Sequence, residues 1–170
     1  MMKILISISD TKGIVTFLNK LATFYSNIEI IATSGTNKYL KSHNINSVEI
    51  SDYINFPEIL GGRVKSLHPK IFGGILSRGN LKSHNNELKK HNIKKFDMVI
   101  CNLYEFEKIV NSNDFSNEEA IENIDIGGAS ILRAAAKNYN DVVVISDILD
   151  YDSVLSHIAE NKLNIEIKKK

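Results

Sequence analysis

Residues 3–9 read KILISIS, a short run of apolar side chains that ends in polar ones. A run of this length that is rich in isoleucine is typical of a buried strand. Similar runs occur at residues 28–33, 48–50, 98–102 and 142–146, and each is expected to form a strand. After Gly13, apolar residues recur at helical spacing, so a helix is expected to follow the first strand.

Further helices are expected after the second strand as far as Leu40, and over residues 81–91, 127–138 and 153–161. Strands that alternate with helices indicate crossover connections, which give a largely parallel sheet buried on both faces. No segment resembles a linker. The sequence therefore predicts a single α/β domain over residues 1–170, with a mostly parallel central sheet flanked by helices.

The composition restricts the class of protein. Among 170 residues, 43% are hydrophobic and 24% are charged, and the net charge is +1, which argues against a nucleic-acid partner or a membrane surface. No export signal and no membrane span is recognisable, and the single cysteine, Cys101, fits a reducing compartment. The five histidines lack metal-ligand spacing, so no metal site is expected. We predict a cytoplasmic protein.

Four polar clusters occur where predicted strands end: residues 7–13, 33–36, 101–104 and 125–128. In open parallel sheets, ligands bind beyond the carboxyl ends of the strands, so these clusters are expected to meet at one site. The segment Thr33-Ser34-Gly35-Thr36 joins a strand to a helix, and free N–H groups beside hydroxyls suit a phosphate. The alternative is an ordinary N-cap, in which Ser34 or Thr36 satisfies the first free amides. The glycine motifs of dinucleotide-binding and Walker-type sites are absent.

Residues 61–74 read GGRVKSLHPKIFGG and are expected to form a loop between two glycine pairs. Arg63 offers a fork to carboxylate or phosphate oxygens, and Lys65 offers a point charge. Pro69 restricts His68 to extended geometry. This pattern indicates an anion-binding segment; the alternative is a solvated loop whose glycines only make turns.

Asp125 precedes two glycines and the run ASILRAAAK. It is either the N-cap of a helix or part of an anion site formed by the exposed N–H groups that follow it. Lys137 ends the same run, where a cation favours a helix C-terminus. In one straight helix Lys137 would stand on the order of 15 Å from Asp125, at ~1.5 Å per residue. Either the glycines form a loop that doubles back, or Lys137 reaches the site of another subunit.

Five stretches together resemble one family: ISISD (6–10), TSGT (33–36), SDYINFPEILGGRVKSLHPKIFGGIL (51–76), CNLYEFE (101–107) and ENIDIGGASILRAAAKN (122–138). The chain is similar to the inosine monophosphate (IMP) cyclohydrolase domain, which is the N-terminal half of a bifunctional purine-biosynthesis protein whose other half is a formyltransferase. The resemblance runs from about Ile4 to Tyr151 and implies a methylglyoxal-synthase-like fold. It also suggests a homodimer, with the formyltransferase half absent from this chain.

The resemblance implies an enzyme that closes the purine ring of 5-formamidoimidazole-4-carboxamide ribotide to IMP, with loss of water and without a cofactor, in the last step of de novo purine biosynthesis. Its catalytic residues would be Lys65, Tyr104, Asp125 and Lys137. The resemblance assigns the nucleotide to Ser9, Asp10, Thr11, Thr33, Ser34, Gly35, Thr36, Arg63, Val64, Lys65, Ser66, Cys101, Asn102, Asp125, Ile126 and Gly127.

Four residues depart from the usual family pattern: Thr11 and Lys12 are inverted, Ser34 replaces a glycine, and Glu105 replaces a proline. Such a reaction needs an oxyanion to be stabilised and protons to be moved. Lys65 and the amides after Asp125 are expected to stabilise the oxyanion, Lys137 or Asp125 to shuttle protons, and Tyr104 to orient or assist. One alternative is a regulatory domain of the same fold that senses a nucleotide without catalysis. A second is methylglyoxal synthase itself, which GGRVKSLHPK does not resemble.

Overall fold

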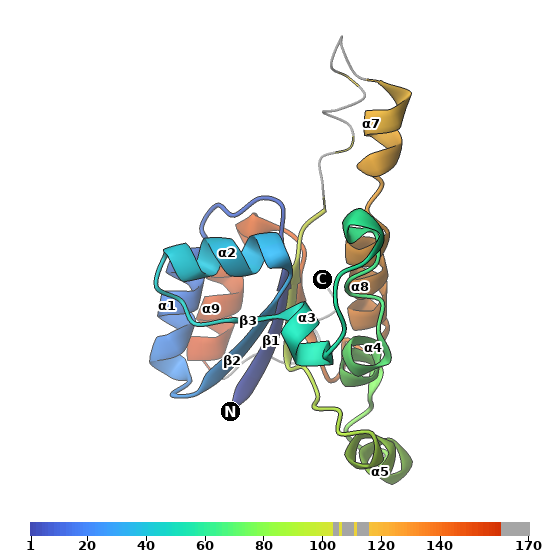
Figure 1. Ribbon diagram of the computed structural model, residues 1–170. Helices are drawn as coiled ribbons and strands as arrows, with labels where there is room; N and C mark the ends of the chain where they lie inside the picture. Colours follow the sequence, from blue (N-terminus) through green and yellow to red (C-terminus); the bar gives the residue numbers. More distant parts are fainter. Residues whose placement is uncertain (104–105, 107–110, 112–115, 161–170) are drawn as a thin grey trace.

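Five parallel strands form the sheet at the centre of the molecule (Figure 1). The computed structural model describes residues 1–103, 106, 111 and 116–160. In these residues the strand order is β3-β2-β1-β4-β5, and each neighbouring pair is parallel. The strands are β1 (Met2–Ser7), β2 (Ile28–Ala32), β3 (Val48–Glu49), β4 (Met98–Cys101) and β5 (Val143–Ile145). The α/β fold with a parallel central sheet is therefore confirmed.

β1 lies in the middle of the sheet, and this position explains why its sequence is so apolar. Ile4, Leu5 and Ile6 are fully buried, and they pair with β2 on one side and with β4 on the other. Successive side chains of a strand point to opposite faces. Ile4 and Ile6 accordingly belong to one hydrophobic cluster and Leu5 to another, so the protein has a core on each face of the sheet.

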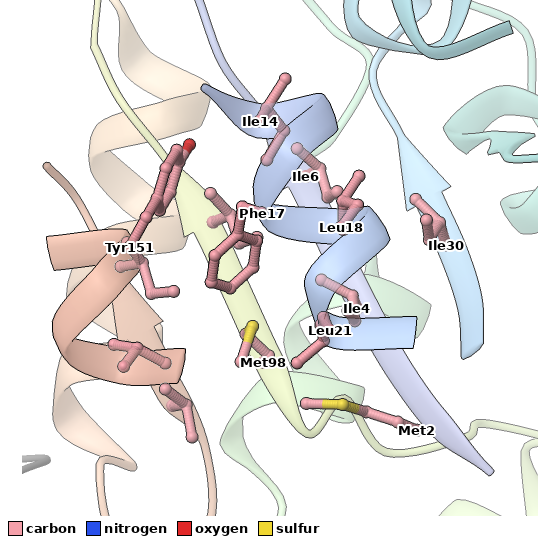
Figure 2. Packing of buried hydrophobic residues seen from close by; sticks show 14 of the residues in the cluster. Met2, Ile4, Ile6, Ile14, Phe17, Leu18, Leu21, Ile30, Met98 and Tyr151 are labelled. Atoms are coloured by element: carbon pink, nitrogen blue, oxygen red, sulfur yellow. The ribbon is translucent and has the colours of Figure 1, made fainter. Parts of the chain in front are cut away.

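Helices cover both faces (Figure 1). The first core packs under α1 (Ile14–Phe24), α2 (Ser34–Ser42) and α9 (Tyr151–Ala159). Phe17 of α1 meets Tyr151 of α9 with ring centroids 4.7 Å apart (Figure 2). The second core packs under α3 (Ile50–Ile54), α4 (Pro69–Leu76) and α8 (Ile126–Lys137). The other described helices are η1 (Leu60–Gly62), α5 (Lys82–Lys90), α7 (Asn117–Glu122) and η2 (Ile148–Asp150), and none of the described helices is long and apolar enough to span a membrane.

The expectation of one loop over residues 61–74 is wrong in its second half, because α4 begins at Pro69. His68 is extended (φ −135°, ψ 143°), as its position before proline predicts, and its Nδ1 accepts a hydrogen bond from the N–H of Lys70 at 3.1 Å. A Cβ on Gly74 would lie 2.6 Å from the carbonyl oxygen of Lys94 and 2.9 Å from the ring of Phe96. This second glycine pair thus lies inside a helix, and Gly74 permits close packing.

A buried ionic cluster lies at the amino-terminal ends of the strands, where β1 and β2 begin. The Lys3 side chain is 3% exposed; its Nζ lies 3.2 Å from Glu29 Oε1 and 4.1 Å from the centre of the Tyr53 ring. Burial lowers the pKa of Lys3, and the hydrogen bond with Glu29 opposes that shift. The backbone N–H of Lys3 donates to Asp97 Oδ2 at 2.7 Å. This end of the sheet therefore contributes to structure and lies away from the polar clusters predicted to bind a ligand.

Candidate functional site

A cavity of about 490 Å³ opens at the carboxyl edge of the sheet. We call it the carboxyl-edge cavity. Its walls come from the loops after β1, β2 and β4, from the segment around η1, and from α7 with the start of α8. Its lining includes nine of the residues predicted to bind substrate: Ser9, Thr33, Arg63, Lys65, Ser66, Asn102, Asp125, Ile126 and Gly127.

The loops after β1 and β4 are joined by the side chain of Asn102. Its Oδ1 accepts hydrogen bonds from the N–H groups of Ser9 at 2.6 Å and Asp10 at 3.0 Å, and its Nδ2 donates to the carbonyl oxygen of Asp10 at 2.8 Å. The Ser9 hydroxyl lies 2.7 Å from the carbonyl oxygen of Leu103. Asn102 therefore fixes the two loops against each other.

The start of α2 has no side-chain cap. Thr36 Oγ1 instead accepts from the N–H of Ile8 at 3.1 Å, so the alternative of capping by Ser34 or Thr36 is wrong. The Ser34 hydroxyl lies 2.7 Å from Glu49 Oε1 and 3.0 Å from Glu58 Oε2. The first N–H groups of a helix have no intrahelical acceptor, so this helix start presents free donors. A Cβ on Gly35 would meet nothing within 4 Å, so the space beside these donors is open.

Residues 59–67 make a tight turn into the cavity. Gly61 and Gly62 have φ values of 64° and 93°, and the N–H of Ile59 donates to the carbonyl oxygen of Val64 at 3.1 Å. The first glycine pair thus makes a turn, as in the solvated-loop alternative, but this turn lies at the cavity. It brings Arg63 and Lys65 to the cavity wall, whereas Val64 is not among the lining residues.

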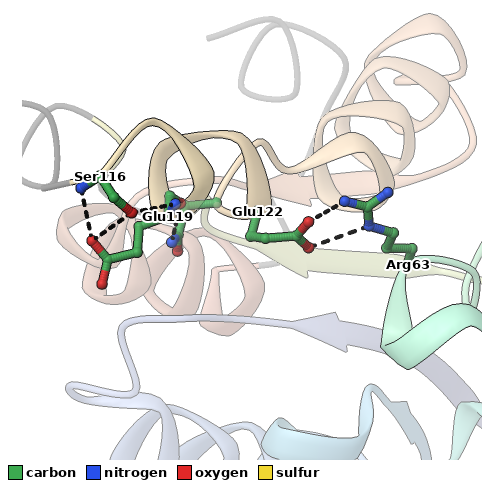
Figure 3. A network of polar contacts seen from close by, with 5 residues as sticks. Arg63, Ser116, Glu119 and Glu122 are labelled. Carbon is green, nitrogen blue, oxygen red and sulfur yellow. Dashed lines mark hydrogen bonds and ion pairs between the residues drawn. The ribbon is translucent and has the colours of Figure 1, made fainter.

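Arg63 is engaged by the protein itself (Figure 3). Its guanidinium forks onto the carboxylate of Glu122 in α7, with Nε 3.2 Å from Oε2. The hydrogen bond from Arg63 lowers the pKa of Glu122. α7 begins with a capping box: Ser116 Oγ accepts from the N–H of Glu119 at 3.1 Å, and the Glu119 carboxylate accepts from the N–H of Ser116 at 2.9 Å. Arg63, which was predicted to bind a substrate anion, thus binds the carboxylate of Glu122 across the cavity.

Ser66 connects residues 63–65, which we call the arginine–lysine segment, to the start of α8. It is 3% exposed, it lines the cavity, and its hydroxyl makes no hydrogen bond with any residue that the structure describes. A Cβ on Gly127 would lie only 2.7 Å from Ser66 Oγ. The two sequence clusters on either side of this contact therefore lie on the same side of the molecule, with Lys65 at the same cavity as Asp125.

Asp125 is the N-cap of α8, since its Oδ1 accepts from the N–H of Gly128 at 2.7 Å. The helix begins at Ile126 and runs for 12 residues to Lys137, so the alternative in which the glycines form a loop that doubles back is wrong. At ~1.5 Å per residue, Lys137 stands about 16 Å from the helix start. It is exposed, and it does not line the cavity of its own chain.

Other predicted site residues lie outside this lining. The Cys101 side chain is buried in the second core, and burial, followed by the charge of Asp125, raises its pKa to about 12. Lys12, which was not among the predicted site residues, lines a different cavity, of about 320 Å³, between α1 and α9. The remaining predicted residues that do not line the carboxyl-edge cavity are Asp10, Thr11, Ser34, Gly35, Thr36 and Val64, whereas Tyr104 lies outside the described residues.

Two acidic residues were not among the predicted site residues. Glu58 and Glu122 both line the cavity. Glu58 stands inside the stretch FPEILGGRVK, five residues before Arg63. Its closeness to the predicted anion-binding segment was therefore a signal in the sequence for a site residue. Glu122 contacts Arg63 across 59 positions of the sequence, and no local pattern indicates that pairing. No group of three or more His, Cys, Asp or Glu side chains in the described ranges is placed to hold a metal ion.

Comparisons with known proteins agree with this architecture. The family model of the MGS-like domain matches residues 13–130. The chain is 45% identical to the bifunctional purine biosynthesis protein PurH of Prochlorococcus marinus strain NATL2A, over 98% of the chain and 32% of that protein. It is 48% identical to PurH of Thermoanaerobacter sp. strain X514, over 93% of the chain and 31% of that protein. It thus spans about a third of the length of these curated relatives.

A solved structure gives the same fold. The crystal structure of ForH superposes with a TM-score of 0.81 at 30% identity and covers 99% of this chain and 87% of that one. The match extends over the sheet and over the loops that form the carboxyl-edge cavity. On the evidence of the family model and of its own parallel sheet, the chain belongs to the family of MGS-like domains.

Proposed function

We propose that this chain is an IMP cyclohydrolase that closes the purine ring of 5-formamidoimidazole-4-carboxamide ribotide with loss of water. The observation that carries the proposal is the meeting of Lys65, Ser66 and the start of α8 at one cavity. The similarity to purine biosynthesis proteins over nearly the whole chain supports it. The proposed reaction belongs in the cytoplasm and needs no cofactor.

In the proposed reaction, the carboxamide nitrogen attacks the neighbouring formyl carbon, a C–N bond forms, and the formyl oxygen becomes an oxyanion. Because both groups belong to one substrate, the site mainly has to hold them in attacking geometry. Lys65 and the free N–H groups at the start of α8 are suited to stabilise the oxyanion. The C–O bond then breaks and the oxygen leaves as water after taking up two protons. The carboxamide nitrogen and the formamido nitrogen lose one proton each, and a C=N double bond forms between the former formyl carbon and the formamido nitrogen.

Proton transfer is assigned to Asp125 and Lys137, with Tyr104 orienting the substrate. Asp125 Oδ1 is used by the helix cap, so its other oxygen, Oδ2, is the one proposed to act. Lys137 lies at the far end of α8, so we propose that it serves the site of a second subunit in a homodimer. A formyltransferase domain is the further partner proposed for a longer chain.

The start of α2 is the proposed phosphate subsite. Its uncapped N–H groups and the open space at Gly35 support this assignment, because a helix N-terminus binds anions. Thr33 faces the cavity at the same place. Ser9 and Asn102 hold the neighbouring loops in position, and their backbone groups complete this side of the site.

The test is turnover by the isolated chain, followed as the absorbance of inosinate formed from the formamido ribotide. A Lys65→Ala variant is expected to lose at least 100-fold in kcat with an unchanged circular dichroism spectrum, because an oxyanion-stabilising group is removed. Lys70→Ala is the matched control: it comes from the same segment, but Lys70 Nζ lies 3.4 Å from the carbonyl oxygen of Ile54 and away from the cavity.

Normal activity of the Lys65→Ala variant would remove this lysine from the mechanism. Tight binding of inosinate by the wild-type chain without any turnover would favour the nucleotide-sensing alternative. Release of methylglyoxal from a triose phosphate would identify the third activity considered above.

A further inference from the structure

In the part of the chain that the structure describes, two charged side chains at the carboxyl-edge cavity have neither an ionic partner nor a helix-capping role. Five charged residues line it: Glu58, Arg63, Lys65, Glu122 and Asp125. Arg63 and Glu122 form an ion pair, and Asp125 caps α8. Among the residues that the structure describes, neither Lys65 nor Glu58 forms an ion pair. A ligand that fits this cavity has to satisfy one cation and one carboxylate.

Glu58 is held in place, yet it keeps free acceptor positions. Its Oε2 lies 3.0 Å from the Ser34 hydroxyl, which has a single proton and lies nearer to Glu49 Oε1, at 2.7 Å. Its Oε1 lies against the backbone of Gly62, where a Cβ would come within 2.5 Å. A carboxylate has about four lone-pair positions, so Glu58 can still accept hydrogen bonds from a ligand.

The position of Glu58 decides which part of a nucleotide meets it. An unpaired carboxylate repels a phosphate, so the group next to it has to be a hydrogen-bond donor. Ser34, which contacts Glu58, is the first residue of α2, where the phosphate subsite is proposed. In a nucleoside monophosphate, the ribose follows the phosphate and carries two adjacent hydroxyl groups.

We propose that Glu58 accepts hydrogen bonds from the 2′- and 3′-hydroxyl groups of the ribose and makes the site selective for ribonucleotides. Lys65 remains free for the developing oxyanion. This inference rests on the proposed function, because it takes a nucleoside monophosphate as the ligand.

Calorimetric titration with IMP and with its 2′,3′-dideoxy analogue tests the inference. Wild-type protein is expected to bind IMP at least tenfold more tightly, since the dideoxy analogue cannot donate hydrogen bonds to the charged carboxylate. In Glu58→Ala the two nucleotides are expected to bind with similar affinity. Glu58→Gln, which keeps the size and one acceptor but no charge, is expected to give an intermediate ratio.

Glu49→Ala is the matched control. Glu49 shares the Ser34 hydroxyl with Glu58, but it does not line the cavity, so its replacement is expected to preserve the preference for IMP. The inference fails if wild-type protein does not discriminate, or if Glu58→Ala or Glu58→Gln discriminates as strongly as wild type. If neither nucleotide binds, the nucleotide site fails as well. If IMP binds with the expected preference but the turnover assay shows no ring closure, only the proposed catalytic function is contradicted.

Discussion

Gly35 stands near the start of α2, in a conformation open to any residue, and no atom lies within 4 Å of the place where its Cβ would be. Gly127 differs, because a Cβ there would press on Ser66 Oγ at 2.7 Å. The two glycines therefore have different roles. Gly127 lets α8 approach the arginine–lysine segment, whereas nothing in the described structure requires Gly35 to lack a side chain. A ligand that approaches the helix start would supply the reason.

Replacement of Gly35 by alanine separates stability from binding. The free energy of unfolding is expected to rise by roughly 0.5–1 kcal/mol, because alanine is the better residue in a helix. Affinity for IMP is expected to fall at least tenfold, because the new methyl group occupies the path of the phosphate. Urea titration and calorimetry measure the two effects on the same sample, and an unchanged affinity would remove the phosphate from this helix start.

Individual residues also show where sequence reasoning reaches its limit. The cap at Asp125 and the extended backbone of His68 follow from local rules, and both were recognisable before the structure. The pairing of Arg63 with Glu122 depends on the fold that brings residues 59 positions apart together. A free guanidinium was therefore expected where the structure has an ion pair.

At the level of elements, strands were easier to predict than helices. Each predicted strand overlaps an observed one, because buried parallel strands are continuous apolar runs. The helices α3, α4 and α7 were missed. In α4, the glycines at residues 73 and 74 look like the end of a loop, yet Gly74 allows the helix to approach Phe96 and the backbone of Lys94. A glycine required by tertiary packing cannot be told from a turn glycine in one sequence.

α4 supplies a direct test of this packing. In Gly74→Ala the added Cβ would lie 2.6 Å from the carbonyl oxygen of Lys94, a backbone atom that cannot move aside easily. The free energy of unfolding is expected to fall by about 1–3 kcal/mol, the usual cost of an overpacked core. The midpoint of urea unfolding measures it, with the open helical site Gly35→Ala as the comparison. Equal stability of Gly74→Ala and wild type would contradict the packing role.

For the whole molecule, the buried thiol of Cys101 predicts a stability that depends on alkaline pH. Its pKa is raised from an ordinary 9.0 to about 12, first by burial and then by the charge of Asp125. Below pH 9 the thiol is protonated in both states, and its contribution to stability is complete. Above pH 9 the unfolded chain loses this proton while the native chain keeps it, so stability falls by about 1.4 kcal/mol per pH unit as the pH rises toward 12.

The measurement compares wild type with Cys101→Ala in urea at pH 8, 9.5 and 10.5. The difference in unfolding free energy between the two proteins is expected to shift against wild type as the pH rises. Tyr151, whose pKa burial also raises to about 12, is present in both proteins, so its contribution cancels. A constant difference over this pH range would show that the thiol titrates alike in the native and unfolded chains.

The ionic cluster around Lys3 has a wider consequence. Lys3 is the second residue of β1 and Ser7 is its last, so about 13 Å of backbone, at ~3.3 Å per residue, separates that cluster from the end of the strand that faces the carboxyl-edge cavity. Substitutions that far apart usually have additive effects on stability. Laboratory evolution can therefore raise stability at the end of the sheet that holds Lys3, for example by exchanging the buried charges for apolar side chains. It can change substrate selectivity at the carboxyl-edge cavity independently, with little trade-off between the two.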